Sequence, residues 1–114
     1  METVRLDTTA IVDWTSFHRA FADLMGFPDF YGMNMNAWID CMSSLDESGM
    51  TRFVLRPQEQ LTIEVTNTEE FARRVPEIFT ALCECTAFVN QRYVHSADQP
   101  IQWAAQPVIL LAFL

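Results

Sequence analysis

The stretch "FPDFYGMNMNAWIDCMSSL", residues 27–45, decides how the rest of the chain folds around it. Pro28 marks a turn, and a helix is predicted from about Met33 to Leu45. At roughly 100° per residue, one side of that helix is an entirely apolar stripe, formed by Met35, Trp38, Met42 and Leu45. This side is predicted to face the core.

The other side of the predicted helix carries polar residues. Asn36 and Asp40 lie one turn apart, Ser43 follows them, and Ile39 shares their face. An apolar residue flanked by an amide and a carboxylate is more typical of a binding surface than of a solvated helix back. The alternative is that Asp40 is only a surface acid.

Two aromatic residues and a glycine directly precede this helix. Gly32 allows a turn conformation that a Cβ atom would penalise. At least one of the rings of Phe30 and Tyr31 is expected near the start of the helix, where it would flank the polar patch. The alternative is that both rings cap the core.

The elements before and after this stretch alternate between strands and helices. A strand is predicted at 4–6 and a helix from the N-cap Asp13 to Gly26. The apolar positions of that helix are Trp14, Phe17, Phe21 and Leu24. A second strand is predicted at 61–65, followed by two helices separated at Pro76, with inward-facing residues Phe71, Val75, Ile78, Leu82, Cys85 and Val89.

The chain ends on the apolar run "PVILLAFL", residues 107–114, which predicts a strand buried on both faces. Residues 52–56 fit either an added edge strand or an extended loop. The alternation predicts an α/β fold in which a small, mainly parallel, three-stranded sheet packs with about four helices in two or three layers. Residues 1–114 are expected to form a single domain.

The charge balance argues against direct nucleic-acid binding. All seven basic residues are arginines, the net charge is -8, and no basic residue lies between Arg19 and Arg52. Affinity for nucleic acid comes mainly from cationic contacts to phosphate, which such a surface lacks. A basic protein partner would be attracted instead. The alternative is that the charge serves solubility alone.

Nothing in the sequence predicts a membrane segment or a secretory signal, so a cytoplasmic location is expected. The three cysteines, Cys41, Cys83 and Cys85, are predicted to be buried, reduced packing residues. The pair at 83 and 85 would project on nearly opposite sides of a helix and could not bind one metal together. No metal or cofactor is expected.

An enzyme is not expected, because the chain has no nucleophile elbow, phosphate-binding glycine loop or paired His–Glu metal motif. His18 is predicted to be a structural hydrogen-bonding residue, although a Cys41–His18 nucleophile pair is conceivable. His95 is predicted at a helix end, and Trp103 in a loop before the last strand. The methionines are predicted to fill the core: Met25, Met33, Met35, Met42 and Met50.

The opening stretch resembles the signature of the barstar family, the intracellular inhibitors of barnase-type ribonucleases. The matching residues are Pro28, Asp29, Tyr31, Gly32, Asn34, Ala37, Asp40 and Cys41. His18, in "DWTSFH", also falls where the family often has histidine. The resemblance implies a barstar-like fold and an inhibitor or immunity protein that blocks a basic ribonuclease or nuclease toxin. The alternative is a non-inhibitory interaction module that retains the fold.

The resemblance also implies roles for individual residues. Asp40 matches the acid that enters the ribonuclease active site in place of a substrate phosphate, and Phe30 matches an aromatic that stacks on the enzyme. Ile39 matches a contact position that is often Trp. The full predicted partner-binding set is Phe30, Tyr31, Gly32, Asn34, Asn36, Ile39, Asp40 and Ser43.

The chain departs from the family pattern at several positions. Met33 and Asn36 stand where the family has acids, and Glu84 is the nearest counterpart of a further acidic contact. Residues 47–60 and 90–106 look like insertions. Fewer charges imply a weaker or differently charged partner.

Overall fold

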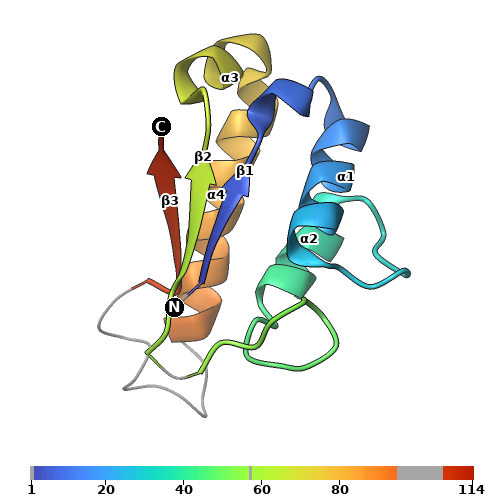
Figure 1. Ribbon diagram of the computed structural model, residues 1–114, viewed down its shortest axis with the longest axis vertical. Coiled ribbons are helices and arrows are strands. Elements are labelled where there is room, and N and C mark those ends of the chain that lie inside the picture. Colours follow the sequence, from blue (N-terminus) through green and yellow to red (C-terminus); the bar gives the residue numbers. More distant parts are fainter. Residues whose placement is uncertain (1, 57, 95–106) are drawn as a thin grey trace.

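The computed structural model describes residues 2–56, 58–94 and 107–114. Its elements, in chain order, are β1 (Glu2–Leu6), the 3-10 turn η1 (Thr8–Ala10), α1 (Trp14–Met25), α2 (Met35–Met42), β2 (Leu61–Val65), α3 (Thr68–Arg74), α4 (Pro76–Val94) and β3 (Ile109–Phe113). The predicted α/β class is confirmed, with four α-helices and a three-stranded parallel sheet (Figure 1).

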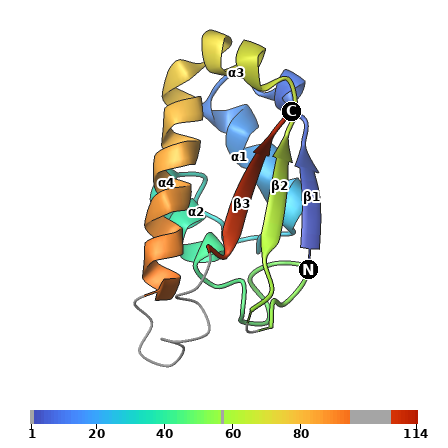
Figure 2. The ribbon, with the colours of Figure 1, turned by 90° about the vertical axis from the view of Figure 1, so that its left-hand side faces the viewer.

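The sheet has the strand order β1-β2-β3, and both neighbouring pairs are parallel. The two side views show α1, α2 and α4 together on one face of the sheet (Figures 1 and 2). The register places Leu61 between Glu2 and Ile109, and Val65 between Leu6 and Phe113. Leu61, Ile63 and Val65 are fully buried towards the helices. The fold is therefore the two-layer alternative of the prediction.

The last strand is not buried on both faces as predicted. Within β3, Ile109 is buried, whereas Leu110 and Phe113 are exposed. The reason is the position of β3 at an edge of the sheet, together with the location of α1, α2 and α4 on one face. The Phe113 ring finds a partial partner in Phe79, with centroids 5.7 Å apart.

Residues 52–56 form the extended loop rather than the edge strand. Two of their backbone bonds run to the helical layer: Arg52 N–H donates to the carbonyl of Met25, the last residue of α1, at 2.9 Å, and Leu55 N–H donates to the carbonyl of Leu45, in the turns after α2, at 2.8 Å. Leu55 is buried. The alternating pattern that resembled a strand thus reflects a loop that packs one side against the helical layer.

The boundaries of α1 agree with the predicted caps. The Asp13 carboxylate accepts a hydrogen bond from Ser16 N–H at 2.8 Å, and the Ser16 hydroxyl accepts one from Asp13 N–H at 3.0 Å. Gly26 ends the helix with φ of +70°, a conformation that glycine adopts without strain. Phe17, Phe21 and Met25 are buried, but Trp14 is partly exposed.

Several smaller predictions also meet the structure. Phe71, Ile78, Leu82 and Val89 are in the core, and Val75 and Cys85 pack against it. Of the cysteines, which are all free, Cys41 is buried, but Cys83 and Cys85 are only half-buried. Met25 and Met42 fill the core, whereas Met33 is 40% exposed. His95 and Trp103 lie outside the described residues. Among the described helices, no segment has the length and apolar character needed to cross a bilayer.

Candidate functional site

The helix α2 is held by the side that the sequence predicts to be apolar. Trp38, Met42 and Leu45 are fully buried. The Trp38 ring meets the Phe21 ring of α1 edge to face, with centroids 5.6 Å apart. The helical bounds are shorter than the predicted 33–45, because Ser43 is the C-cap and turns follow it. The packing fixes the direction in which the opposite side points.

The start of α2 is set by a side-chain cap. Asn34 accepts a hydrogen bond from Ala37 N–H at 2.8 Å through its amide oxygen, and its amide nitrogen donates to the Gly32 carbonyl at 3.2 Å. The residue with left-handed backbone is Met33, with φ of +56°, and not Gly32 as predicted. Gly32 instead permits close approach, since an added Cβ would lie 3.3 Å from the Asn34 amide nitrogen.

The other end of α2 is fastened to α4 by one phenol. The Tyr93 hydroxyl donates to the Met42 carbonyl at 2.7 Å and accepts from Leu45 N–H at 2.9 Å. Burial raises the pKa of Tyr93, so the hydroxyl keeps its proton throughout the neutral range. Because Tyr93 lies about 50 residues from its partners in sequence, local pattern gave no signal of this role.

The two aromatic residues before α2 have different environments. The Tyr31 hydroxyl lies 2.6 Å from His18 Nδ1, and its ring packs against Phe27 with centroids 4.7 Å apart. His18 is buried, and burial lowers its pKa. Phe30, by contrast, is 76% exposed. The structure thus gives Tyr31 a scaffold position and leaves Phe30 available for contact.

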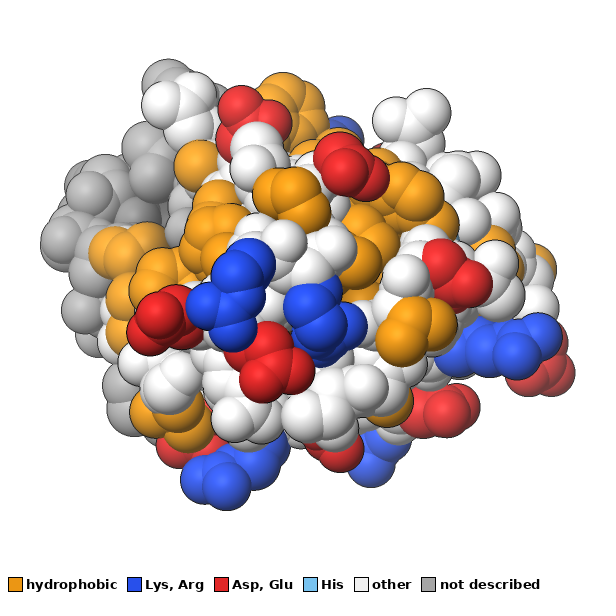
Figure 3. All heavy atoms as spheres, turned by 90° about the horizontal axis from the view of Figure 1, so that it is seen from above, with side chains coloured by type: hydrophobic (Ala, Val, Ile, Leu, Met, Phe, Trp, Pro, Cys, Tyr) orange, Lys and Arg blue, Asp and Glu red, His pale blue; other side chains and the backbone are white. Residues whose placement is uncertain are grey.

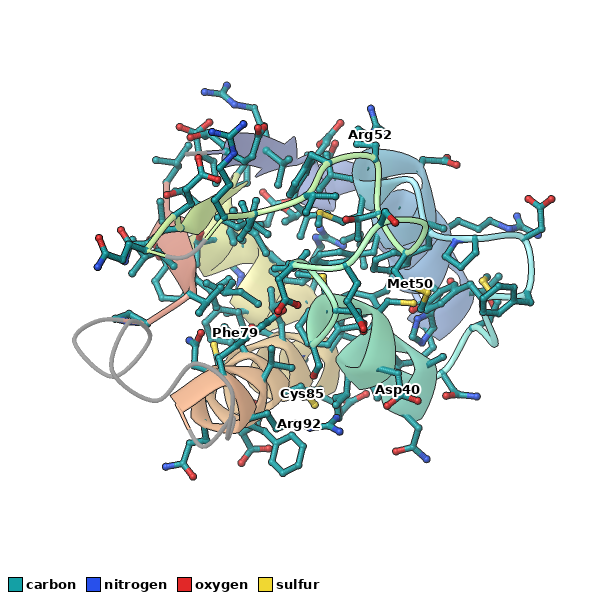
Figure 4. All side chains as sticks on the ribbon, turned by 90° about the horizontal axis from the view of Figure 1, so that it is seen from below. Asp40, Met50, Arg52, Phe79, Cys85 and Arg92 are labelled. Carbon is teal, nitrogen blue, oxygen red and sulfur yellow. The ribbon has the colours of Figure 1, made fainter. Side chains whose placement is uncertain are left out.

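The outward side of α2 presents the acid singled out from the sequence. The Asp40 side chain is 73% exposed, and it projects from α2 at the edge of the molecule (Figure 4). Asn36, one turn earlier, is also exposed, whereas Ile39 and Ser43 are half-buried. Ile39 packs partly against the core, so it contributes less free surface than predicted. The structure therefore brings Asn36 and Asp40 together at the surface.

A residue not in the predicted set lies beside this acid. Arg92 of α4 places Nη1 3.7 Å from Asp40 Oδ1 and 3.4 Å from the Ser43 hydroxyl. Figure 4 shows Asp40 and Arg92 on neighbouring helices at one edge of the molecule. The pair is open to solvent, so Asp40 is turned outward and its charge is only loosely matched.

The charge at the opposite end of the molecule is arranged differently. Seen from above, at the α3 end, arginines and acids lie side by side (Figure 3). Arg74 pairs there with Glu70 at 3.3 Å and also donates to the carbonyl oxygens of Thr8 and Ile11. Arg74 therefore serves the fold, because it joins α3 to the carbonyl groups of the segment after β1.

The candidate site lies apart from the two surface hollows found among the described residues. One surface hollow, of about 360 Å³, is lined by residues that include Arg5, Asp23 and Arg52, and another lies at the α3 end. None of the eight predicted residues lines either hollow. Over the described ranges, no group of His, Cys, Asp and Glu residues is arranged to hold a metal ion. The candidate site consists mainly of exposed side chains on α2 and in the segment before it.

A comparison with protein-family models gives a match over most of the chain. The family model described as "Barstar (barnase inhibitor)" matches residues 1–106. No curated protein matches the chain.

Proposed function

Because the chain belongs to the barstar family, we propose that it is an inhibitor or immunity protein that binds and blocks the active site of a basic ribonuclease or nuclease toxin domain. The expected partner is a protein, and neither nucleic acid nor a membrane is bound directly. The proposed place of action is the cytoplasm, as the family resemblance implies. The protein needs no cofactor for this function and is not itself an enzyme.

The observation that carries the proposal is the exposed carboxylate of Asp40 on a helix held at both ends. A nuclease cleft is lined with cationic side chains that hold phosphodiester charge, and charge-assisted hydrogen bonds to such groups are strong. A carboxylate can take the place of a phosphate without offering a bond to cleave. Because α2 is capped by Asn34 and fastened by Tyr93, little ordering of Asp40 is required on binding.

The neighbours of Asp40 supply the rest of the proposed contact. Phe30 offers a large exposed ring, which is typical of residues that anchor interfaces. Asn36 can form hydrogen bonds but brings no charge, so the anionic character of this side of α2 rests on Asp40. Glu84, which is exposed on α4, is a further candidate contact.

The decisive experiment compares two carboxylates in the same assay. The protein is titrated against purified barnase-type ribonucleases and nuclease toxin domains, with calorimetry for affinity and RNA cleavage for inhibition. Asp40→Asn keeps the shape and removes the charge, and we expect it to weaken binding by about a hundredfold or more, as for one lost partner of a buried ion pair. The matched control, Glu69→Gln on α3, should change affinity less than about twofold. Equal effects of the two variants would contradict an active-site plug.

A second candidate function is a non-inhibitory interaction module that retains the fold. It is favoured by the absence of a second acid at Asn36 and by the arginine beside Asp40, both of which reduce the charge offered to a cationic cleft. Binding of a non-nuclease partner, with an affinity insensitive to Asp40→Asn, would support this function over inhibition.

A further inference from the structure

The guanidinium of Arg92 is placed by three contacts on one side of α4. It lies 3.7 Å from the Asp40 carboxylate, 3.4 Å from the Ser43 hydroxyl, and 5.8 Å from the centre of the Phe88 ring. Phe88 lies four residues before Arg92, on the same face of the helix. The cation is thus held beside the acid by groups from both helices.

The next residue, Tyr93, keeps this pairing in register. Its hydroxyl bonds to Met42 and Leu45, directly after the turn of α2 that carries Asp40. Since the clamp is buried, α2 and the end of α4 stay aligned while Arg92 and Asp40 remain at the surface. The fold therefore sets the two helix backbones at a distance from which the Arg92 and Asp40 side chains meet at the surface.

This placement has a consequence for docking. A cleft that holds phosphate is cationic, so it attracts Asp40 and repels Arg92. Binding must replace the internal pair by pairs with the partner and bring a guanidinium of like charge close to the cleft. Both effects oppose association.

We propose that Arg92 is an intramolecular counter-ion that competes with the partner's cationic groups for Asp40 and thereby weakens docking. The inference rests on the proposed function, because it concerns the same acid and the same class of partner. In this role Arg92 lowers the affinity by its effect on Asp40, and it requires no contact of its own with the partner.

The test uses the full chain and the nucleases of the panel above as probes. Arg92→Gln removes the charge and keeps a polar side chain of similar length. Arg73→Gln, on α3 at the other end of the molecule, removes the same charge far from Asp40. We expect Arg92→Gln to tighten binding about two- to tenfold, and Arg73→Gln to change it less than twofold, because exposed pairs make modest contributions.

A double-mutant cycle separates the contribution of the Arg92–Asp40 pair from the general effect of net charge on binding. In an Asp40→Asn background, the gain in affinity from Arg92→Gln should become smaller, because only the repulsion between the guanidinium and the cationic cleft is then left to relieve. With Asp40 intact, the gain in affinity from Arg92→Gln should become smaller as the salt concentration is raised from about 0.05 to about 0.5 M, since exposed charges are then screened. The free energy of unfolding in urea should be the same for both arginine variants and the wild-type chain. A change in stability is then excluded as the cause of the change in affinity.

Different outcomes contradict different claims. If the wild-type chain binds a nuclease and Asp40→Asn abolishes binding, but Arg92→Gln leaves the affinity unchanged or lowers it, the counter-ion role is wrong and the proposed function stands. A loss of affinity would show that Arg92 contacts an acid on the partner. If neither the wild-type chain nor Arg92→Gln binds any nuclease of the panel, both proposals are overturned.

Discussion

The inward and outward sides of α2 differ in burial, polarity and packing, although they belong to one helix of eight residues. The inward side, with Trp38, Cys41 and Met42, is buried, and Tyr93 fastens its end. The outward side leaves Asn36 and Asp40 in solvent. The difference shows how a small protein aims one carboxylate: residues behind it supply the rigidity. Changes on the inward side should therefore alter stability, and changes on the outward side should alter binding.

The largest effect is expected for Trp38→Ala on the inward side. Truncating this fully buried ring should lower the free energy of unfolding by about 3–5 kcal/mol, because apolar contact is lost and a cavity remains. Urea unfolding at pH 7 measures it. Trp38→Phe is the control and should lose much less, since a ring is kept and the indole N–H has no acceptor among the described residues. A loss below about 1 kcal/mol for Trp38→Ala would contradict the importance of this side.

Next in size is Tyr93→Phe, which removes one oxygen from the clamp. Leu45 N–H then loses its acceptor in a buried position, and we expect a loss of about 1–3 kcal/mol in the free energy of unfolding. Hydrogen exchange of the Leu45 amide should also become faster. Exchange that stays unchanged would show that the phenol does not hold this end of α2.

In the exposed segment before α2, Phe30→Ala should affect nuclease binding much more than stability. Among the residues that the structure describes, Phe30 is the most exposed large hydrophobic one, so its truncation should change the free energy of unfolding by less than about 0.5 kcal/mol. Under the proposed function it should weaken nuclease binding by about 1–2 kcal/mol, as for an aromatic at an interface centre. Calorimetry and urea unfolding on the same sample measure both. A large loss of stability would break the division between the two sides.

A smaller effect is expected at the cap that starts α2. Asn34→Ala removes the acceptor for Ala37 N–H and should lower the free energy of unfolding by about 1 kcal/mol. Asn34→Asp keeps an acceptor for Ala37 N–H and should therefore retain most of the stability that Asn34→Ala loses. If the aspartate variant is as unstable as the alanine variant, the cap is not the origin of the effect.

The smallest effect on the free energy of unfolding is expected from pH, through the buried His18. Burial lowers the pKa of His18 in the folded chain below its ordinary value of 6.5, so the unfolded chain binds the proton more readily. The stability contributed by neutral His18 is fully present above pH 6.5 and declines as the pH falls below it. Urea unfolding at pH 7.5 and 5.5 should show this decline, and it should be reduced in His18→Gln. An identical decline in the variant would assign the pH dependence to other groups.

What could be predicted from the sequence is what local chemistry decides. The Asp13 cap and Gly26 delimited α1, and the spacing of Trp38 and Met42 gave the buried side of α2. Asp40 was correctly expected to face outward, since the apolar stripe leaves that side no alternative.

What failed depends on parts of the chain that are far apart in sequence. Residues 52–56 have a strand-like pattern, but Arg52 N–H bonds to the end of α1 and Leu55 N–H bonds to the turns after α2. The partial exposure of β3 follows from its edge position, which no local pattern reveals. The contacts of Arg92 and Tyr93 with α2 likewise join residues about 50 positions apart, and only the packing of the two helices creates them.

The burial of Cys41 directly behind Asp40 makes this thiol a natural reporter for opening of the helix. Burial raises its pKa, so in the closed state it is protected from alkylating reagents both by inaccessibility and by the lack of thiolate. With the half-buried thiols replaced as Cys83→Ser and Cys85→Ser, the rate of alkylation at Cys41 would report how often α2 detaches from the core. A partner that binds α2 would lower this rate of alkylation. A target could therefore be recognised by this effect, without any assay of the target's own activity.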